Sequence, residues 1–239
     1  MASEVTRRGF LGTAGTVVAA GAAAGVASAQ PAEAGRSKQI KIIGVCCSPR
    51  KGKTTFASLQ VCLEAAKAVS GRIEVELIEL AGMKIDGSLA AGLPLEPGQK
   101  DDFPELVPKL SDPSVGGIIV GTPVYFGNMT SLCKAFLDRC IAFRKNDFAL
   151  RDKVAGVLAV GGVRNGGQEL TIRSVQAALM CQEMILVGDG APTGHFGATV
   201  WSGAEGGVTE DEFGMATTRN LGRRVAEVAL RVAGKVGSG

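Results

Sequence analysis

The stretch from Ile40 to Thr55 constrains the fold of this 239-residue chain more than any other. An apolar run, a polar cationic turn and a helical pattern follow one another in it, as IKIIGVCCSPRKGKTT. Residues 40–45 are mostly β-branched and are bounded by turn residues, which is typical of a strand buried on both faces. From Phe56 on, apolar residues recur every three or four positions, which indicates a helix packed on a sheet. The stretch therefore predicts a strand, a turn and a helix.

The turn within this stretch has the chemistry of a phosphate site. The first N–H groups of a helix have no intrahelical partner, and together with the helix dipole they favour an anion. Several side chains of the turn add positive charge or hydroxyl donors. They are Ser48, Arg50, Lys53, Thr54 and Thr55.

Two other interpretations of this turn remain open. Gly52-Lys53-Thr54 resembles the end of a P-loop, but the glycine expected five residues before Gly52 is Cys47. The P-loop interpretation also needs a strand ending in Asp to hold magnesium, whereas the next buried strand ends at Gly121 and Thr122. The turn could also be an ordinary solvated basic turn. Taken alone, it favours phosphate more than ATP.

Strand and helix patterns alternate along the rest of the chain. We predict strands at 40–45, 73–77, 115–120, 153–160 and 184–187, and helices at about 53–69, 103–110, 129–143, 168–181 and 210–232. A long loop is expected at 81–102, and a glycine-rich loop runs to Thr209. This alternation predicts an α/β fold, a doubly wound five-stranded parallel sheet of order 2-1-3-4-5 with helices on both faces. The second strand alternates strictly and fits an edge.

The carboxyl ends of strands 1, 3 and 4 carry the most unusual stretches, SPRKGKTT, TPVYFGN and GGVRNGG. They should converge at the edge of the sheet where the winding direction reverses. Tyr125 and Phe126 offer a flat surface to a planar ring, and Gly127 lets a backbone approach closely. Ordinary packing under a loop is the alternative. In the third loop, Arg164 can meet negative charge.

The first 29 residues differ from the rest. Residues 6–11 (TRRGFL) precede a Gly/Ala/Val run, and Ala27-Ser28-Ala29 provides small residues for a signal peptidase. The segment resembles a twin-arginine export signal, which implies use of the Tat export machinery, cleavage after Ala29 and a periplasmic location. A membrane anchor is the alternative, but the apolar run is shorter than the roughly 20 residues that a spanning helix needs. A linker at 30–38 and one domain at 39–235 would follow.

Composition limits the remaining functions. The formal charge of +3 gives no case for nucleic acid, which calls for a clustered basic face. We expect most of the six cysteines to be small core residues, with Cys47 of interest because it lies beside the phosphate turn. His195, the only histidine, is expected to be structural rather than a general base, and no metal site is predicted. The role of Trp201 stays open between a cover for the ring and a core residue.

SPRKGKTT, GTPVYFGNMTSLCKAFLDR and GGVRNGGQE together resemble the flavodoxin-like NADPH-dependent FMN reductase and iron-sulfur flavoprotein families. The resemblance covers nearly all of residues 39–234. It implies that the first loop binds the FMN phosphate, that the second lies along the isoalloxazine and ribityl chain, and that the third closes on the ring edge. The implied residues of the second and third loops are Pro123, Val124, Tyr125, Phe126, Gly127, Asn128, Gly161, Gly162, Arg164 and Gly167.

Two departures from the families matter. Cys47 replaces a small residue, and residues 63–132 contain no cysteine, where iron-sulfur members carry a cysteine cluster. We therefore expect an FMN-dependent oxidoreductase without an iron-sulfur cluster. It would pass electrons from a reduced nicotinamide or another donor, small molecule or protein, to a quinone, metal ion or small acceptor. The alternative is a non-catalytic flavodoxin-type carrier, whose typically acidic surface does not match this charge. The resemblance also implies a homodimer or homotetramer.

Overall fold

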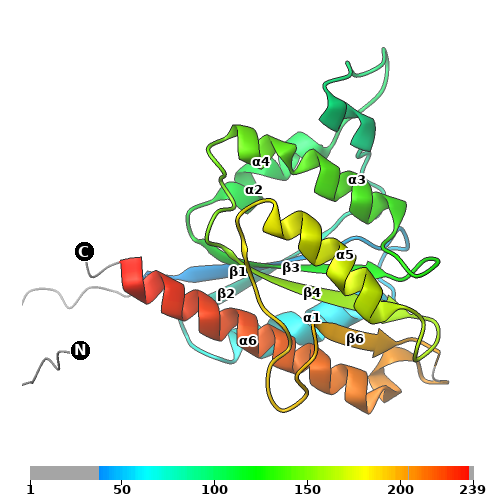
Figure 1. The fold of residues 1–239 in the computed structure, drawn as a ribbon, viewed down its shortest axis with the longest axis vertical. Helices are drawn as coiled ribbons and strands as arrows, with labels where there is room; N and C mark the ends of the chain where they lie inside the picture. The colour runs from blue at the N-terminus through cyan, green and yellow to red at the C-terminus, as the bar shows by residue number, and fades with distance from the viewer. Residues whose placement is uncertain (1–37, 204, 237–239) are drawn as a thin grey trace, which may run out of the picture. The chain divides into compact units, whose positions relative to one another are not determined.

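A parallel sheet lies at the centre of residues 38–203 and 205–236, the part of the chain that this computed structural model describes (Figure 1). The predicted export signal, its cleavage site and the linker up to residue 37 lie outside the described residues. The strands are β1 (Ile40–Cys46), β2 (Ile73–Glu79), β3 (Val115–Pro123), β4 (Val154–Gly161), β5 (Ile185–Leu186) and β6 (Ala198–Trp201). The α-helices are α1 (Thr54–Lys67), α2 (Val107–Ser111), α3 (Ser131–Arg139), α4 (Ile141–Lys145), α5 (Gln168–Met180) and α6 (Glu212–Val236).

The order of the sheet is β2-β1-β3-β4-β5, as predicted. Every pairing of strands is parallel, with Ile43 opposite both Glu76 of β2 and Ile118 of β3. The alternating strand β2 lies at the edge, also as predicted. Because the strands are parallel, the loops after β1, β3 and β4 leave from one edge of the sheet.

The fifth position of the sheet differs from the prediction. β5 has only two residues and pairs with Val154 and Ala155, at the amino end of β4. The chain then leaves the sheet and returns as β6, which pairs in parallel with the carboxyl half of β4. The predicted strand at 184–187 was too long, and the predicted loop up to Thr209 was wrong at residues 198–201. Two glycines allow the chain to leave the sheet and return between β5 and β6. A Cβ atom at Gly188 would collide with the carbonyl oxygen of His195, and a Cβ atom at Gly197 would collide with the carbonyl oxygen of Val157.

The bounds of several other elements differ from the prediction. β3 continues to Pro123, beyond the predicted end at Val120. The helix predicted at 129–143 is divided into α3 and α4 at Cys140, and the one predicted at 103–110 is a 3-10 turn (Phe103–Glu105) followed by α2. The predicted loop 81–102 contains the 3-10 helix Gly87–Ala91. A third 3-10 helix, Gly207–Glu210, precedes α6.

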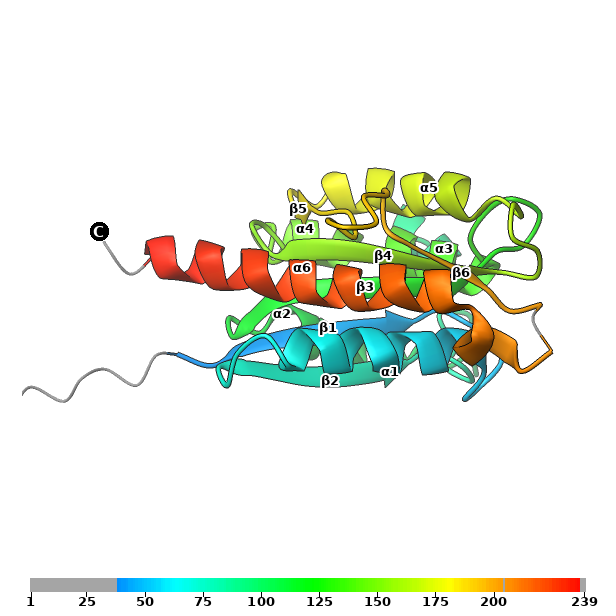
Figure 2. The same cartoon turned by 90° about the horizontal axis from the view of Figure 1, so that it is seen from below.

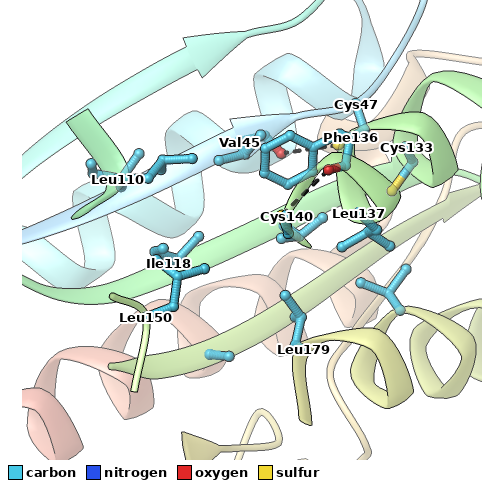
Figure 3. Packing of buried hydrophobic residues seen from close by; sticks show 14 of the residues in the cluster. Val45, Cys47, Leu110, Ile118, Cys133, Phe136, Leu137, Cys140, Leu150 and Leu179 are labelled. Atoms are coloured by element: carbon cyan, nitrogen blue, oxygen red, sulfur yellow. Dashed lines mark hydrogen bonds between the residues drawn. The ribbon is translucent and has the colours of Figure 1, made fainter. Parts of the chain in front are cut away.

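Two apolar layers cover the two faces of the sheet. On one face, α2, α3, α4 and α5 bury apolar side chains against the strands, Phe143 of α4 among them. Figure 3 shows Leu110, Phe136 and Leu179 of this layer. On the other face, α1 and α6 lie side by side (Figure 2) and bury Leu59, Leu221 and others. None of the helices in the described ranges is long and apolar enough to cross a membrane.

Candidate functional site

The three predicted loops meet at one edge of the sheet. The N–H of Cys47, after β1, donates to the carbonyl of Gly121 in β3 at 2.8 Å. The N–H of Val124, after β3, donates to the carbonyl of Val160 in β4 at 2.9 Å. These bonds hold the starts of the first and second loops against neighbouring strands, so the structure brings the predicted residues together.

The first loop is braced from within and from β2. The buried Ser48 accepts the N–H of Arg50 on its hydroxyl at 3.2 Å. Gly52 has a φ of +62°, a left-handed conformation that favours glycine, and its N–H donates to Oε1 of Glu79 at 2.6 Å. A carboxylate at the end of β2 therefore holds the tip of the loop.

The start of α1 has the features of an anion site. Lys53 occupies the N-cap without a side-chain capping bond, and no acidic residue lies in the first turn. The hydroxyl of Thr55 is buried and has no hydrogen-bond partner among the described residues. Arg50 and Lys53 are exposed above this turn, and Thr54 is half-buried. A buried hydroxyl without a partner is costly, and a phosphate oxygen would satisfy it.

The second loop closes as a tight turn. Tyr125 and Asn128 exchange backbone hydrogen bonds of 2.8 and 3.1 Å, with Phe126 and Gly127 at the tip. Both tip residues have positive φ, +51° and +73°, as in a type I′ turn. A bulky residue with positive φ is uncommon and strained. Phe126 is nevertheless fully exposed, so no burial compensates for the strain.

Pro123 and Val124 directly precede this turn in the sequence. Pro123 is buried at the end of β3, and Val124 is half-buried. The exposed Tyr125 and Asn128 lie next to the strained tip. The aromatic surface predicted from the sequence is therefore present.

The third loop is organised by Gln168, the first residue of α5. Its side chain donates to the carbonyl of Val163 at 2.8 Å and accepts the N–H of Gly166 at 2.8 Å. Gly167 packs so closely on the second loop that a Cβ atom there would lie 2.9 Å from Cα of Gly127. Gly161 is buried at the end of β4, and Gly162 is exposed. The second and third loops therefore share one wall.

Arg164 has a partner within the protein. Its guanidinium bonds the buried carboxylate of Asp211 at 2.5 Å and lies over the ring of Trp201 at 5.2 Å. Asp211 also accepts the N–H of Trp201 at 2.7 Å and that of Gly214 at 3.0 Å. Burial alone would raise the pKa of Asp211, but the bonds from Arg164, Gly214 and Trp201 outweigh it and hold the pKa below its usual value.

Trp201 belongs to the same edge of the site. Its indole N–H donates to the carbonyl of Gly162 at 3.1 Å. Trp201 is half-buried and braces the third loop from the end of β6, and its role as a cover for the ring stays a prediction.

A group of buried thiols lies beneath the first loop. Five of the six cysteines are buried, as predicted, and Cys181 is exposed. Cys47, just after β1, and Cys133 and Cys140, on and just after α3, lie in the core layer between α3 and the sheet (Figure 3). Burial, and then the neighbouring thiol of Cys133, raise the pKa of Cys47 well above its usual value. Burial likewise raises the pKa of Cys46 to about 11. These are core thiols rather than nucleophiles.

His195 lies in the loop between β5 and β6 and lines a cavity together with Arg164 and Gly167 of the third loop. Its Nδ1 is 3.4 Å from the buried carboxylate of Asp189, and its ring packs edge-on against Phe213. These contacts hold the imidazole ring in place, and a structural role for His195 stays a prediction. Among the residues that the structure describes, no group of three or more His, Cys, Asp or Glu side chains is arranged to hold a metal ion.

Three residues of the site were missed from the sequence. They are Glu79, Thr130 and Gln168. Thr130 links two elements, because its hydroxyl donates to the carbonyl of Cys47 at 2.8 Å and accepts the N–H of Cys133 at 3.1 Å. A threonine three residues before a helical stripe is a recognisable N-cap signal. The hydrogen-bond partners of Glu79 and Gln168 depend on how the loops close, so no local pattern identified these two residues.

Comparisons with known proteins agree with this geometry. The sequence profile of the family described as NADPH-dependent FMN reductase matches residues 40–198. An iron-sulfur flavoprotein of Methanocaldococcus jannaschii is 40% identical over 194 residues, covering 79% of this chain and 97% of its own. An NAD(P)H dehydrogenase (quinone) of Chromohalobacter salexigens is 30% identical, covering 72% of this chain and 89% of its own. The solved structure of a flavodoxin, WrbA-like protein of Agrobacterium tumefaciens has a similar fold, with a TM-score of 0.58 at 19% identity, covering 81% of this chain and 99% of that one.

The residues present fit the FMN that these comparisons indicate. The uncapped start of α1 and the partnerless hydroxyl of Thr55 suit a phosphate, and both lie within the first loop. The exposed aromatic turn 125–128 and the open third loop stand next to it on the same edge. An anionic tail and a flat ring can therefore be held together there.

Proposed function

This chain belongs to the NADPH-dependent FMN reductase family and uses FMN, and from that premise we propose that it is an exported oxidoreductase. It takes electrons from a reduced nicotinamide or another donor and passes them to a quinone, metal ion or small acceptor. The observation that carries the proposal is the meeting of a phosphate-type helix start, an exposed aromatic turn and an open glycine loop at one edge of the sheet.

The protein's part in this activity is to bind and orient, since FMN supplies the two-electron chemistry. The N–H groups at the start of α1, with Lys53 and Thr55, would hold the phosphate. Residues 125–128 would offer the ring an aromatic surface, and Gly162 would leave room beside it. Arg164 shapes the third loop through Asp211 and keeps part of its guanidinium exposed for negative charge. No side chain in this scheme acts as an acid or base.

Electrons pass through the flavin alone in this proposal. The relatives named iron-sulfur flavoproteins contrast with this chain, whose residues 63–132 contain no cysteine. Five of its cysteines are buried in the two apolar layers that cover the sheet. They are not arranged as a metal site within the described ranges.

Export and assembly complete the proposal. Residues 6–11 and the small residues before position 30 support export by the twin-arginine route, cleavage after Ala29 and a periplasmic location. A homodimer or homotetramer, in which a neighbour covers the exposed Phe126, is the assembly we expect. Because nicotinamides are scarce outside the cytoplasm, a redox protein is an alternative donor.

The visible spectrum of the protein purified from its own periplasm tests the cofactor and the location together. We expect a flavin spectrum, about one FMN released per chain on denaturation, and an N-terminus at residue 30. Colourless protein that does not bind added FMN would refute the site. Flavin-containing periplasmic protein that begins at Met1 would contradict only the cleavage after Ala29.

Steady-state oxidation of NADH and NADPH, with quinone or ferric acceptors, tests the activity. Turnover with any pair supports an enzyme. Bound FMN with no turnover from any donor would instead indicate a flavodoxin-type carrier.

A further inference from the structure

A cavity lies at the edge of the sheet opposite the three loops, where the strands begin. It has a volume of about 290 Å³ and is bounded by the starts of β1, β3 and β4 and by the last turns of α6. In Figure 1 this is the side where β1 begins and α6 ends. Ile40, Val115 and Val232 form apolar walls. None of the residues assigned to FMN lines it.

A buried lysine is part of the lining. Lys153 is only 8% exposed. Its ammonium donates to two backbone carbonyls, those of Asp112 and Val115, both at 2.9 Å. No carboxylate within the described ranges lies within ion-pair distance of it. A buried charge that only neutral oxygens contact is poorly compensated.

The ionisation of Lys153 agrees with this geometry. Burial lowers the pKa of its ammonium, and the negative charge of Asp112 opposes the shift only in part. An anion placed in the cavity would favour the charged form.

Arg72 adds a second unsatisfied cation to the same lining. Its Nε is buried and has no acceptor among the described residues, while Nη2 donates to the carbonyl of Lys38 at 3.2 Å. The guanidinium is thus held by one hydrogen bond, while the buried Nε–H has no acceptor among the described residues. Guanidinium and ammonium groups together match the oxygens of a phosphate.

The other charges of the lining do not cancel these two. The charge of Arg151 is balanced by Glu183, whose carboxylate lies 2.5 Å from its Nε. Lys38 is exposed and adds positive charge, and the exposed Asp152 is the one carboxylate of the lining. The balance of the lining remains positive.

We propose that this cavity binds the phosphate group of a small anion through Lys153 and Arg72. The site is separate from the FMN site and needs no flavin chemistry. Its ligand joins the starts of three strands to α6, so we expect binding to raise the thermal stability of the chain.

The test uses the FMN-loaded full chain, so that FMN occupies the first loop, and titrates inorganic phosphate, pyrophosphate and ADP by calorimetry. We expect one site, weakened about tenfold or more in Arg72→Gln, the loss that a charged hydrogen bond brings. Arg144→Gln removes an equal charge from an exposed arginine of α4 outside the cavity and should bind like the wild type. Lys53→Gln, in the first loop, should also leave this site unchanged.

The outcomes separate the ligand sources. Tighter binding of inorganic phosphate or pyrophosphate than of ADP supports a free anion, and the reverse supports a phosphate ester. If Arg72→Gln unfolds, Lys153→Met replaces it. No binding at about 10 mM ligand, roughly 3 kcal/mol of binding free energy, overturns the proposal. Binding that neither variant weakens overturns it as well.

Discussion

Asp211 ties the third loop to two other elements, and its replacement by Asn tests that link. The carboxylate is completely buried and accepts hydrogen bonds from Arg164, Trp201 and Gly214, which come from the third loop, β6 and α6. Asn keeps the shape but loses the charge and one acceptor position. We expect Asp211→Asn to destabilise the fold and to loosen the third loop.

The magnitude follows from these bonds. Hydrogen bonds to a charged group contribute about 1.5–3 kcal/mol each, but Asn retains part of them. The Arg164 side chain is 45% exposed, so solvent screens that pair and it adds no more than about 1 kcal/mol. A loss of about 2 kcal/mol in the free energy of unfolding results, or a decrease of about 4–8 °C in Tm for a domain of this size.

The pH dependence provides a sharper check. The pKa of Asp211 is lower in the folded state than the value of about 3.9 for an unfolded aspartate. Its contribution is therefore fully present above that value and is lost as the pH falls through the folded pKa. The difference in Tm between wild type and Asp211→Asn should be constant near neutral pH and shrink below about pH 4.

Thermal unfolding followed by circular dichroism measures both effects. Asp138→Asn is the matched control, because Asp138 is an exposed residue of α3 paired with Lys134 and such a pair contributes about 0.3–0.5 kcal/mol. An unchanged Tm for Asp211→Asn at pH 7, or a difference that does not shrink in acid, would refute the role assigned to the buried carboxylate.

Three further predictions concern the first two loops and the thiols. Thr55→Val should weaken FMN binding about tenfold, because it removes the buried hydroxyl offered to the phosphate. Fluorescence titration of the apoprotein with FMN measures this change. The control Thr209→Val, on the exposed turn before α6, should leave FMN binding unchanged. Phe126→Gly should raise the stability of the apoprotein by about 1 kcal/mol, since it relieves a positive φ at a side chain that buries nothing; an unchanged or lower Tm would contradict this. A thiol reagent should modify one cysteine of the native protein, Cys181, and all six after unfolding; two or more fast-reacting native thiols would contradict the assigned burial.

Much of the fold was predictable because its signals are local. The β-branched run at 40–45, the largely apolar run at 153–160 and the helical stripe after Phe56 specify two strands and a helix from local sequence alone. Parallel alternation then restricts the order of the sheet and the edge where loops gather. The strand at 198–201 escaped prediction because it is four residues long and lies between glycines, so it becomes a strand only against the free half of β4.

Local patterning was thus sufficient for the sheet order and for the three loops that lie together. The partners of individual side chains came only with the folded chain. Arg164 was expected to face the ring edge, yet its guanidinium pairs with Asp211, 47 residues away in sequence. Glu79 holds Gly52 across 27 residues, and Lys153 reaches the carbonyl of Asp112 across 41. A hydrogen bond between distant residues depends on where the packed helices and strands place its two atoms, and no periodicity in the chain encodes that position.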